Sequence, residues 1–168
     1  RYYIDGTWRM TGSSQFGANH RYGHFWSGGL GWNILNEDFM AAWIDRIDLF
    51  KLRASMGYTG KVSFSPFQAM TMYQYENTYE YKNGIGAVPV TIGNIDLTWE
   101  RTMNYNIGLD FSMFGSRLNV VVDAYLRNTT DLLLDKSKAP STGVTTATSN
   151  LGEMQNKGLE FQVDGYIF

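Results

Sequence analysis

The chain has 168 residues, a formal net charge of −2 at neutral pH and no cysteine. The charge argues against a nucleic-acid partner, which usually needs a basic face. The lack of cysteine excludes disulfide bonds and thiolate metal sites. No run of about 18 apolar residues is present, so no transmembrane helix is predicted. Aromatic residues make up 15% of the chain, with 18 glycines and 3 prolines, a composition that suits long β-strands and loops.

Three segments in the first part of the chain alternate between apolar and polar side chains, at residues 2–10, 26–34 and 50–58. Because neighbouring side chains on a strand point to opposite faces, each segment predicts a strand with one apolar and one polar face. A long loop rich in Gly, Ser and Asn, at residues 12–22, separates the first two strands. A shorter link at residues 35–46, which can hold one helical turn, precedes the third.

The second part of the chain continues the alternation at residues 97–111, 118–127 and 159–167. Arg101 alone breaks the apolar row of the first of these segments. A tight turn with the sequence FGSR joins the fourth and fifth strands. Long loops at roughly 59–96 and 129–155 follow the third and fifth strands.

Long and short connections thus alternate between about six long strands, which is typical of a transmembrane β-barrel with long outer loops and short periplasmic turns. A barrel strand needs about 9–11 residues to cross a bilayer. Lipid satisfies no backbone polar group, so such strands must close into a ring. Even small barrels need about eight strands. The fold class predicted is therefore all-β: an antiparallel arc of a larger barrel. Both ends of the sequence fall within patterned segments, so we expect a piece of a longer protein.

The alternation assigns side chains to the two faces of this arc. Aromatic residues predicted to face lipid or to form the aromatic girdle are Trp8, Trp26, Trp32, Trp99, Tyr105 and Phe111. Charged residues predicted to face a wet lumen, where they pair across strands, are Asp5, Arg9, Lys51, Arg53, Glu100, Asp110, Asp123, Arg127, Glu160 and Asp164.

Little in the sequence points to catalysis. His20 and His24 lie in or beside the first loop without further ligands nearby, so no metal site is predicted. No catalytic residue and no cofactor is predicted, and the chain is not expected to be an enzyme. The third loop carries a tyrosine cluster that could contact a substrate or a partner, or could pack as an extension of the strands. Its members are Tyr73, Tyr75, Tyr79 and Tyr81.

An ordered set of motifs runs through nearly the whole chain. It comprises WRMTGSSQFG, HRYGHFWSGGLGWNILNEDF, LFKLRASMGYTG, LTWERTMNYNIGLDF, DLLL and TGVTTATSNLGEMQNKGLEF. This set resembles the SusC/RagA family of TonB-dependent outer-membrane transporters. The departures are small: Thr11 stands where the family often has Asp, Phe50 interrupts an LKLR motif, and Lys61 stands where Asn is usual.

The resemblance implies a barrel of about 22 strands with an N-terminal plug, of which residues 1–168 are a later part without the plug. It implies a location in the outer membrane of a Gram-negative bacterium of Bacteroidetes type, in contact with lipid and lipopolysaccharide. It further implies import of oligosaccharides or peptides, with a SusD-like surface lipoprotein as lid and TonB contacted through regions outside this chain. Two alternatives remain open at this point: a passive porin-like channel and a soluble carbohydrate-binding β-sandwich.

Overall fold

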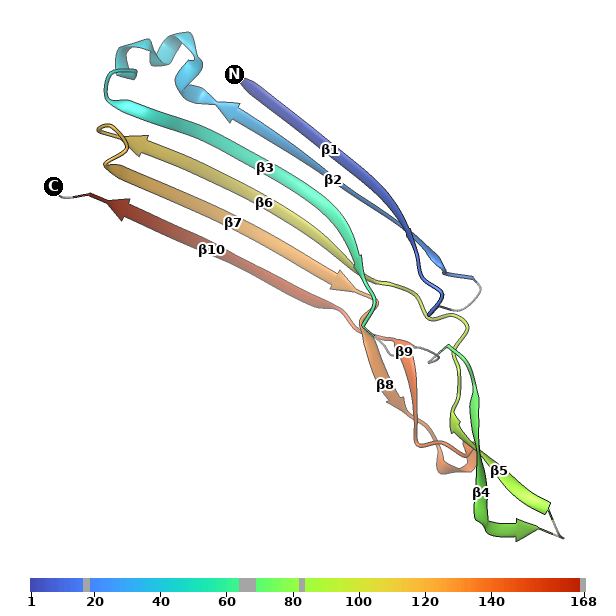
Figure 1. Ribbon diagram of the computed structural model, residues 1–168. Coiled ribbons are helices and arrows are strands. Elements are labelled where there is room, and N and C mark those ends of the chain that lie inside the picture. The colour runs from blue at the N-terminus through green and yellow to red at the C-terminus, as the bar shows by residue number, and fades with distance from the viewer. Residues whose placement is uncertain (17–18, 64–68, 82–83, 167–168) are drawn as a thin grey trace.

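The computed structural model describes residues 1–16, 19–63, 69–81 and 84–166, with the backbone alone for residues 77–81. One antiparallel sheet of six strands dominates it, in the order β1-β2-β3-β6-β7-β10 (Figure 1). Its strands are β1 (Tyr2–Gly12), β2 (Tyr22–Asn33), β3 (Ile47–Lys61), β6 (Glu100–Met113), β7 (Leu118–Thr130) and β10 (Met154–Gly165). The prediction of long antiparallel strands is confirmed, and the sheet is an open arc with β1 and β10 at its edges.

The register between strands gathers the alternating side chains onto two opposite faces. One row of directly opposed residues consists of Ile4, Leu30, Ala54, Ile107, Ala124 and Leu159. The adjacent row on the other side consists of Tyr3, Gly31, Arg53, Gly108, Asp123 and Glu160. We call these sides the apolar face and the polar face. A one-residue slip of any strand would exchange its two sets of side chains, so the pattern fixes the register.

One end of the sheet, which we call the turn end, holds the short connections. Residues 114–117 join β6 to β7, and Phe114, Gly115 and Ser116 all adopt left-handed φ angles near +60°. The link between β2 and β3 forms two 3₁₀-helices, η1 (Ile34–Asn36) and η2 (Asp38–Trp43). The indole of Trp32 donates a hydrogen bond to Glu37, 3.0 Å from nitrogen to oxygen. This bond lowers the pKa of Glu37 and fastens the link to the apolar face.

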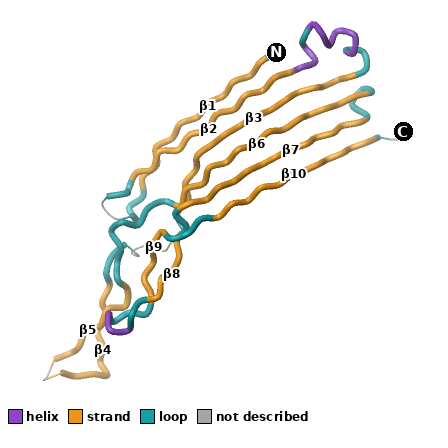
Figure 2. Tube along the Cα trace, turned by 180° about the vertical axis from the view of Figure 1, so that it is seen from behind, coloured by secondary structure: helices purple, strands orange, loops and turns teal. Residues whose placement is uncertain are grey.

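The opposite end, which we call the hairpin end, extends well beyond the sheet (Figure 2). Two hairpins occupy it: β4 (Met72–Tyr81) with β5 (Gly84–Thr91), and β8 (Leu133–Ser137) with β9 (Thr146–Asn150), the latter pair joined through η3 (Pro140–Thr142). The sequence pattern predicted that these segments are loops, whereas the structure forms strands there. Asn150, on β9, fastens the β8–β9 hairpin to the segments that flank the sheet: its amide nitrogen donates to the carbonyl oxygens of Thr98 and Asp131, and its amide oxygen accepts from the Thr98 N–H.

A buried aromatic cluster also lies at the hairpin end. Phe16, Phe25 and Trp99 pack together there, with ring centroids 4.5 Å apart for Phe16 and Trp99. Trp99 differs from the expectation that it faces lipid or forms the aromatic girdle. It lies just before β6 and is only 6% exposed, because its ring packs against Phe16 and Phe25, and its indole donates a hydrogen bond to the His20 carbonyl. In the described parts of the chain, no helix is long and apolar enough to cross a membrane.

Candidate functional site

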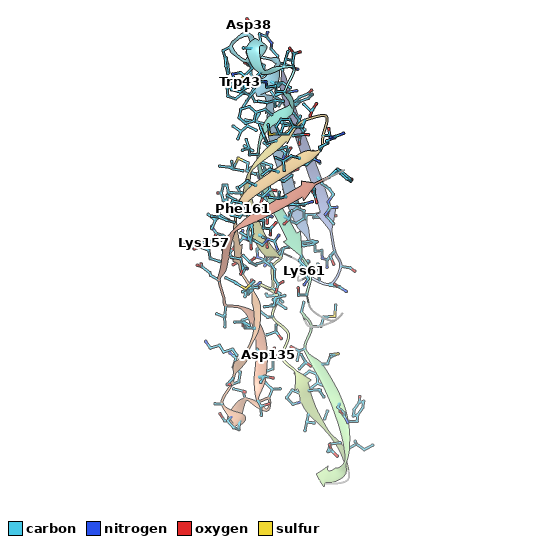
Figure 3. All side chains as sticks on the ribbon, turned by 90° about the vertical axis from the view of Figure 1, so that its left-hand side faces the viewer. Asp38, Trp43, Lys61, Asp135, Lys157 and Phe161 are labelled. Atoms are coloured by element: carbon cyan, nitrogen blue, oxygen red, sulfur yellow. The ribbon has the colours of Figure 1, made fainter. Side chains whose placement is uncertain are left out.

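The polar face holds every charged residue that the alternation predicted there. Figure 3 shows the two sides of the sheet, with Lys61 on one side and Lys157 and Phe161 on the other. The register places the following residues on this one face: Asp5, Arg9, Lys51, Arg53, Glu100, Asp110, Asp123, Arg127, Glu160 and Asp164. That this face borders a lumen in the whole protein stays a prediction.

An ion cluster joins three strands at the middle of this face. Arg53 on β3 donates through Nε to Asp110 on β6, at 3.1 Å, and through a terminal nitrogen to both carboxylate oxygens of Asp123 on β7, at 2.9 and 3.1 Å. Asp123 stands directly opposite Glu160 on β10. Because like charges at directly opposed positions repel, the guanidinium offsets a repulsion that the strand pairing creates.

A glycine lets the guanidinium cross the central strand. Gly108 stands between Arg53 and Asp123 in the register. A methyl group added there would lie 2.3 Å from a carboxylate oxygen of Asp123 and 2.7 Å from the Arg53 nitrogen. Gly31 serves Lys51 in a similar way, since the end of the Lys51 side chain passes close to Gly31, and the ammonium lies 5.2 Å from the centre of the Tyr3 ring. Small residues on this face therefore give long charged side chains room to lie across the strands.

The predicted aromatic residues, Trp99 excepted, lie on the apolar face. Trp8 and Trp26 are directly opposed on β1 and β2. Tyr2 stacks on Trp32 near the turn end, with centroids 6.4 Å apart. Tyr105 and Phe111 stand on β6 opposite Met56 and Phe50. That these rings form a girdle and contact lipid stays a prediction.

A polar hollow of about 390 Å³ opens where β3, β6, β7 and β10 approach the hairpin end. Its polar and charged lining residues are Thr59, Lys61, Glu100, Thr102, Asn104, Arg127, Thr129 and Asn156. The sequence pattern pointed to Glu100 and Arg127 as polar-face residues, but not to a hollow. The hollow arises from the register between several strands. The periodicity of one strand carries no information about that register.

The predicted tyrosine cluster falls on β4, outside the sheet. Tyr73 and Tyr75 point to one side of the hairpin and are 67% and 77% exposed. Tyr79 and Tyr81 belong to the same strand, but their side chains lie outside the described part of the chain. Two exposed tyrosines on a protruding hairpin provide flat rings and hydroxyl groups to a passing ligand or partner.

The two histidines make different contacts. His24 stacks on Trp8 with centroids 5.8 Å apart, whereas His20 contributes its backbone carbonyl to Trp99. Within the described residues, no group of three or more His, Cys, Asp or Glu side chains is placed to hold a metal ion.

Comparison with known proteins decides the family. The model of the family described as "TonB dependent receptor-like, beta-barrel" matches residues 1–168. The chain belongs to this family of TonB-dependent receptor barrels. Its six-stranded sheet is therefore an arc of a receptor barrel, and the resemblance found in the sequence is confirmed.

Several TonB-dependent receptors are similar over nearly the whole chain. "TonB-dependent receptor P39" of Formosa agariphila is 39% identical over 163 residues, which cover 97% of this chain but 15% of that protein. "TonB-dependent receptor SusC" of Bacteroides thetaiotaomicron is 33% identical over 170 residues, covering 98% of this chain and 17% of that protein. The chain thus spans a small share of the receptors it matches.

Solved receptor structures agree with this placement. The RagAB peptide importer in its closed-closed state superposes with a TM-score of 0.88 at 30% identity, covering 99% of this chain and 18% of that chain. The siderophore receptor PirA of Pseudomonas aeruginosa superposes with a TM-score of 0.55 at 15% identity. The second likeness concerns the fold alone.

Proposed function

We propose that this chain is part of the wall of an outer-membrane importer, with its apolar face against lipid and its polar face along the path of the solute. The observation that carries the proposal is the division of the sheet into one continuous apolar face and one charged face, held by the register of six long strands. Barrels in the outer membrane alternate apolar-out and polar-in along every strand. The likeness to the RagAB peptide importer supports import as the activity.

The proposed directions of the strands follow from their connections. The hairpin end faces the outside and the turn end faces the periplasm, because long outer loops and short periplasmic turns are usual in such barrels. A SusD-like surface lipoprotein closes over the hairpin end, where Tyr73 and Tyr75 are exposed. TonB and the plug act through parts of the protein outside residues 1–168. The cargo is an oligosaccharide or a peptide.

Uptake by whole cells tests the proposal. Cells carrying the full-length gene are compared with a deletion strain, each with and without TonB, for growth on glycans or peptides as the sole nutrient. An importer of this type restores growth on at least one nutrient only when TonB is present. Growth restored equally without TonB would favour the passive channel, and a protein recovered in the soluble fraction would contradict a membrane barrel.

A further inference from the structure

The polar hollow at the hairpin end is lined by two cations of the polar face. At the middle of this face Arg53 is shared by two aspartates, whereas Arg9 and Lys51 lie against the rings of Phe25 and Tyr3. The two cations that line the hollow, Lys61 and Arg127, make no ion pair in the described part of the chain.

The guanidinium of Arg127 is held in place through only one of its nitrogens. Its Nε donates to the side-chain oxygen of Asn104 at 3.0 Å, which fixes the plane of the guanidinium. The terminal nitrogens, which form the fork that binds carboxylates in a bidentate manner, have no acidic partner among the described residues. Asn156 stands directly opposite Arg127 on β10 and adds an exposed amide to the same wall.

The carboxylate that lines the hollow forms no ion pair with either cation. Glu100 is 9% exposed, and both of its oxygens are already bonded. One accepts from the Leu133 N–H at 3.1 Å and the other from the Ser63 hydroxyl at 2.6 Å. Lys61 stands opposite Glu100 in the register, without an ion pair between them. The carboxylate is therefore used to join β6 to the hairpin of β8 and to the segment after β3.

The remaining lining combines neutral hydrogen-bonding groups with two apolar side chains, Leu132 and Met154. The hydroxyls of Thr102 and Thr129 lie 3.0 Å apart, so one donates to the other and one hydroxyl proton stays available. A volume of about 390 Å³ lies within the range of small-molecule sites, about 300–1,000 Å³. The hollow thus combines two unpaired cations with hydroxyl and amide groups in a space suited to one or two sugar or amino-acid units.

We propose that this hollow is an anion subsite that binds a carboxylate of the imported solute, with Arg127 as its ligand and Lys61 as a second positive charge in the lining. The inference rests on the proposed function, because the hollow must open onto the path of the solute. The carboxylate could belong to a uronic-acid sugar or to the C-terminus or acidic side chain of a peptide. In both cases the recognised chemistry is the same.

Equilibrium dialysis with the full-length purified protein tests the subsite by binding alone. The probes are trigalacturonic acid and its methyl ester, and a tripeptide and its C-terminal amide, each at low and at physiological salt. We expect the acid of at least one pair to bind at least tenfold more tightly than its neutral counterpart, with a difference that shrinks as salt rises. The pair of probes that shows this difference identifies whether the bound carboxylate belongs to a sugar or to a peptide.

Two variants and a control assign the effect to the hollow. Arg127→Gln should weaken binding of the acid by about tenfold, and Lys61→Gln should weaken it by a smaller factor, both with little change for the neutral probe. Arg117→Gln removes one positive charge from the turn end, far from the hollow, and should change neither. Equal binding of acid and neutral probes, no binding of any probe, or full acid binding by both hollow variants would overturn the subsite. Because dialysis does not depend on TonB, TonB-independent growth with intact acid binding would overturn the import proposal and leave the subsite standing.

Discussion

Replacing Gly108 by alanine tests whether the Arg53 guanidinium needs the space beside Gly108 to cross β6 and reach Asp123. The added methyl group would lie 2.3 Å from Asp123 and 2.7 Å from Arg53, so at least one of the two must move. The contact at stake consists of two charged hydrogen bonds, at 2.9 and 3.1 Å. Bonds to charged groups contribute about 1.5–3 kcal/mol, and exposed ion pairs about 0.2–1 kcal/mol.

The expected loss of unfolding free energy lies between these limits, because the Arg53 and Asp123 side chains are partly exposed, at 40% and 29%. We expect Gly108→Ala to lower the free energy of unfolding by about 1–2 kcal/mol relative to Gly6→Ala. Gly6 is a matched control, since it also lies in a strand and a methyl group there would meet nothing within 4 Å. The two variants share the effect of alanine on strand backbone, which then cancels.

The assay is urea unfolding of the full-length protein refolded into lipid vesicles, followed by tryptophan fluorescence. The same pair of variants is then measured in an Asp123→Asn background. If Gly108 makes room for the Arg53–Asp123 contact, the difference between the two variants should fall by at least half in that background. A difference that persists unchanged would refute the reasoning and assign Gly108 another role.

Three further predictions concern the faces and the hairpin end. Ile107→Arg should destabilise the barrel by about 2–4 kcal/mol if this residue lies near the bilayer midplane, whereas Asn106→Arg should cost little; vesicle unfolding that gives equal losses would reverse the assignment of faces. Asn150→Ala removes three hydrogen bonds, so the backbone amide that it holds should exchange hydrogen faster by at least tenfold, as mass spectrometry can measure, while the middle of the sheet stays protected. Replacing Tyr73 and Tyr75 together by alanine should reduce recovery of the co-expressed lid lipoprotein by several-fold at an unchanged amount of barrel in the membrane; unchanged recovery would remove these rings from the proposed interface.

The sequence predicted the sheet because each long strand carries its own alternation, and one strand suffices to read it. Lys51 and Arg53 could be placed on the polar face from their spacing alone. The hairpins were not predicted as such. The alternating tyrosines of β4 left an extension of the strands as one of several alternatives, and β8 and β9, with five residues each, are too short for alternation to distinguish them from loops. Packing at the hairpin end also overrode the pattern at Trp99, where burial against Phe16 and Phe25 replaced the continuing strand.

The site depended on relations between strands that no single segment contains. That Arg53 meets Asp123 across Gly108 follows from the register of β3, β6 and β7. Lys61 drew attention in the sequence only as a departure from the family motif, although the alternation of β3, if extended, would have placed it on the polar face. That Lys61 and Arg127 line the same hollow depends on the alignment of three strands.

The most direct test of the account is the environment of neighbouring residues on β6, measured in the membrane. Nitroxide labels are attached to single cysteines at Asn106 and Ile107 in the full-length protein, freed of other cysteines and reconstituted in vesicles. Collisions with oxygen report lipid, and collisions with a water-soluble nickel chelate report water. The account predicts high oxygen accessibility at position 107 and high nickel accessibility at position 106, in line with a barrel wall between lipid and an aqueous path. Equal accessibility at the two positions, or the reverse order, would contradict it.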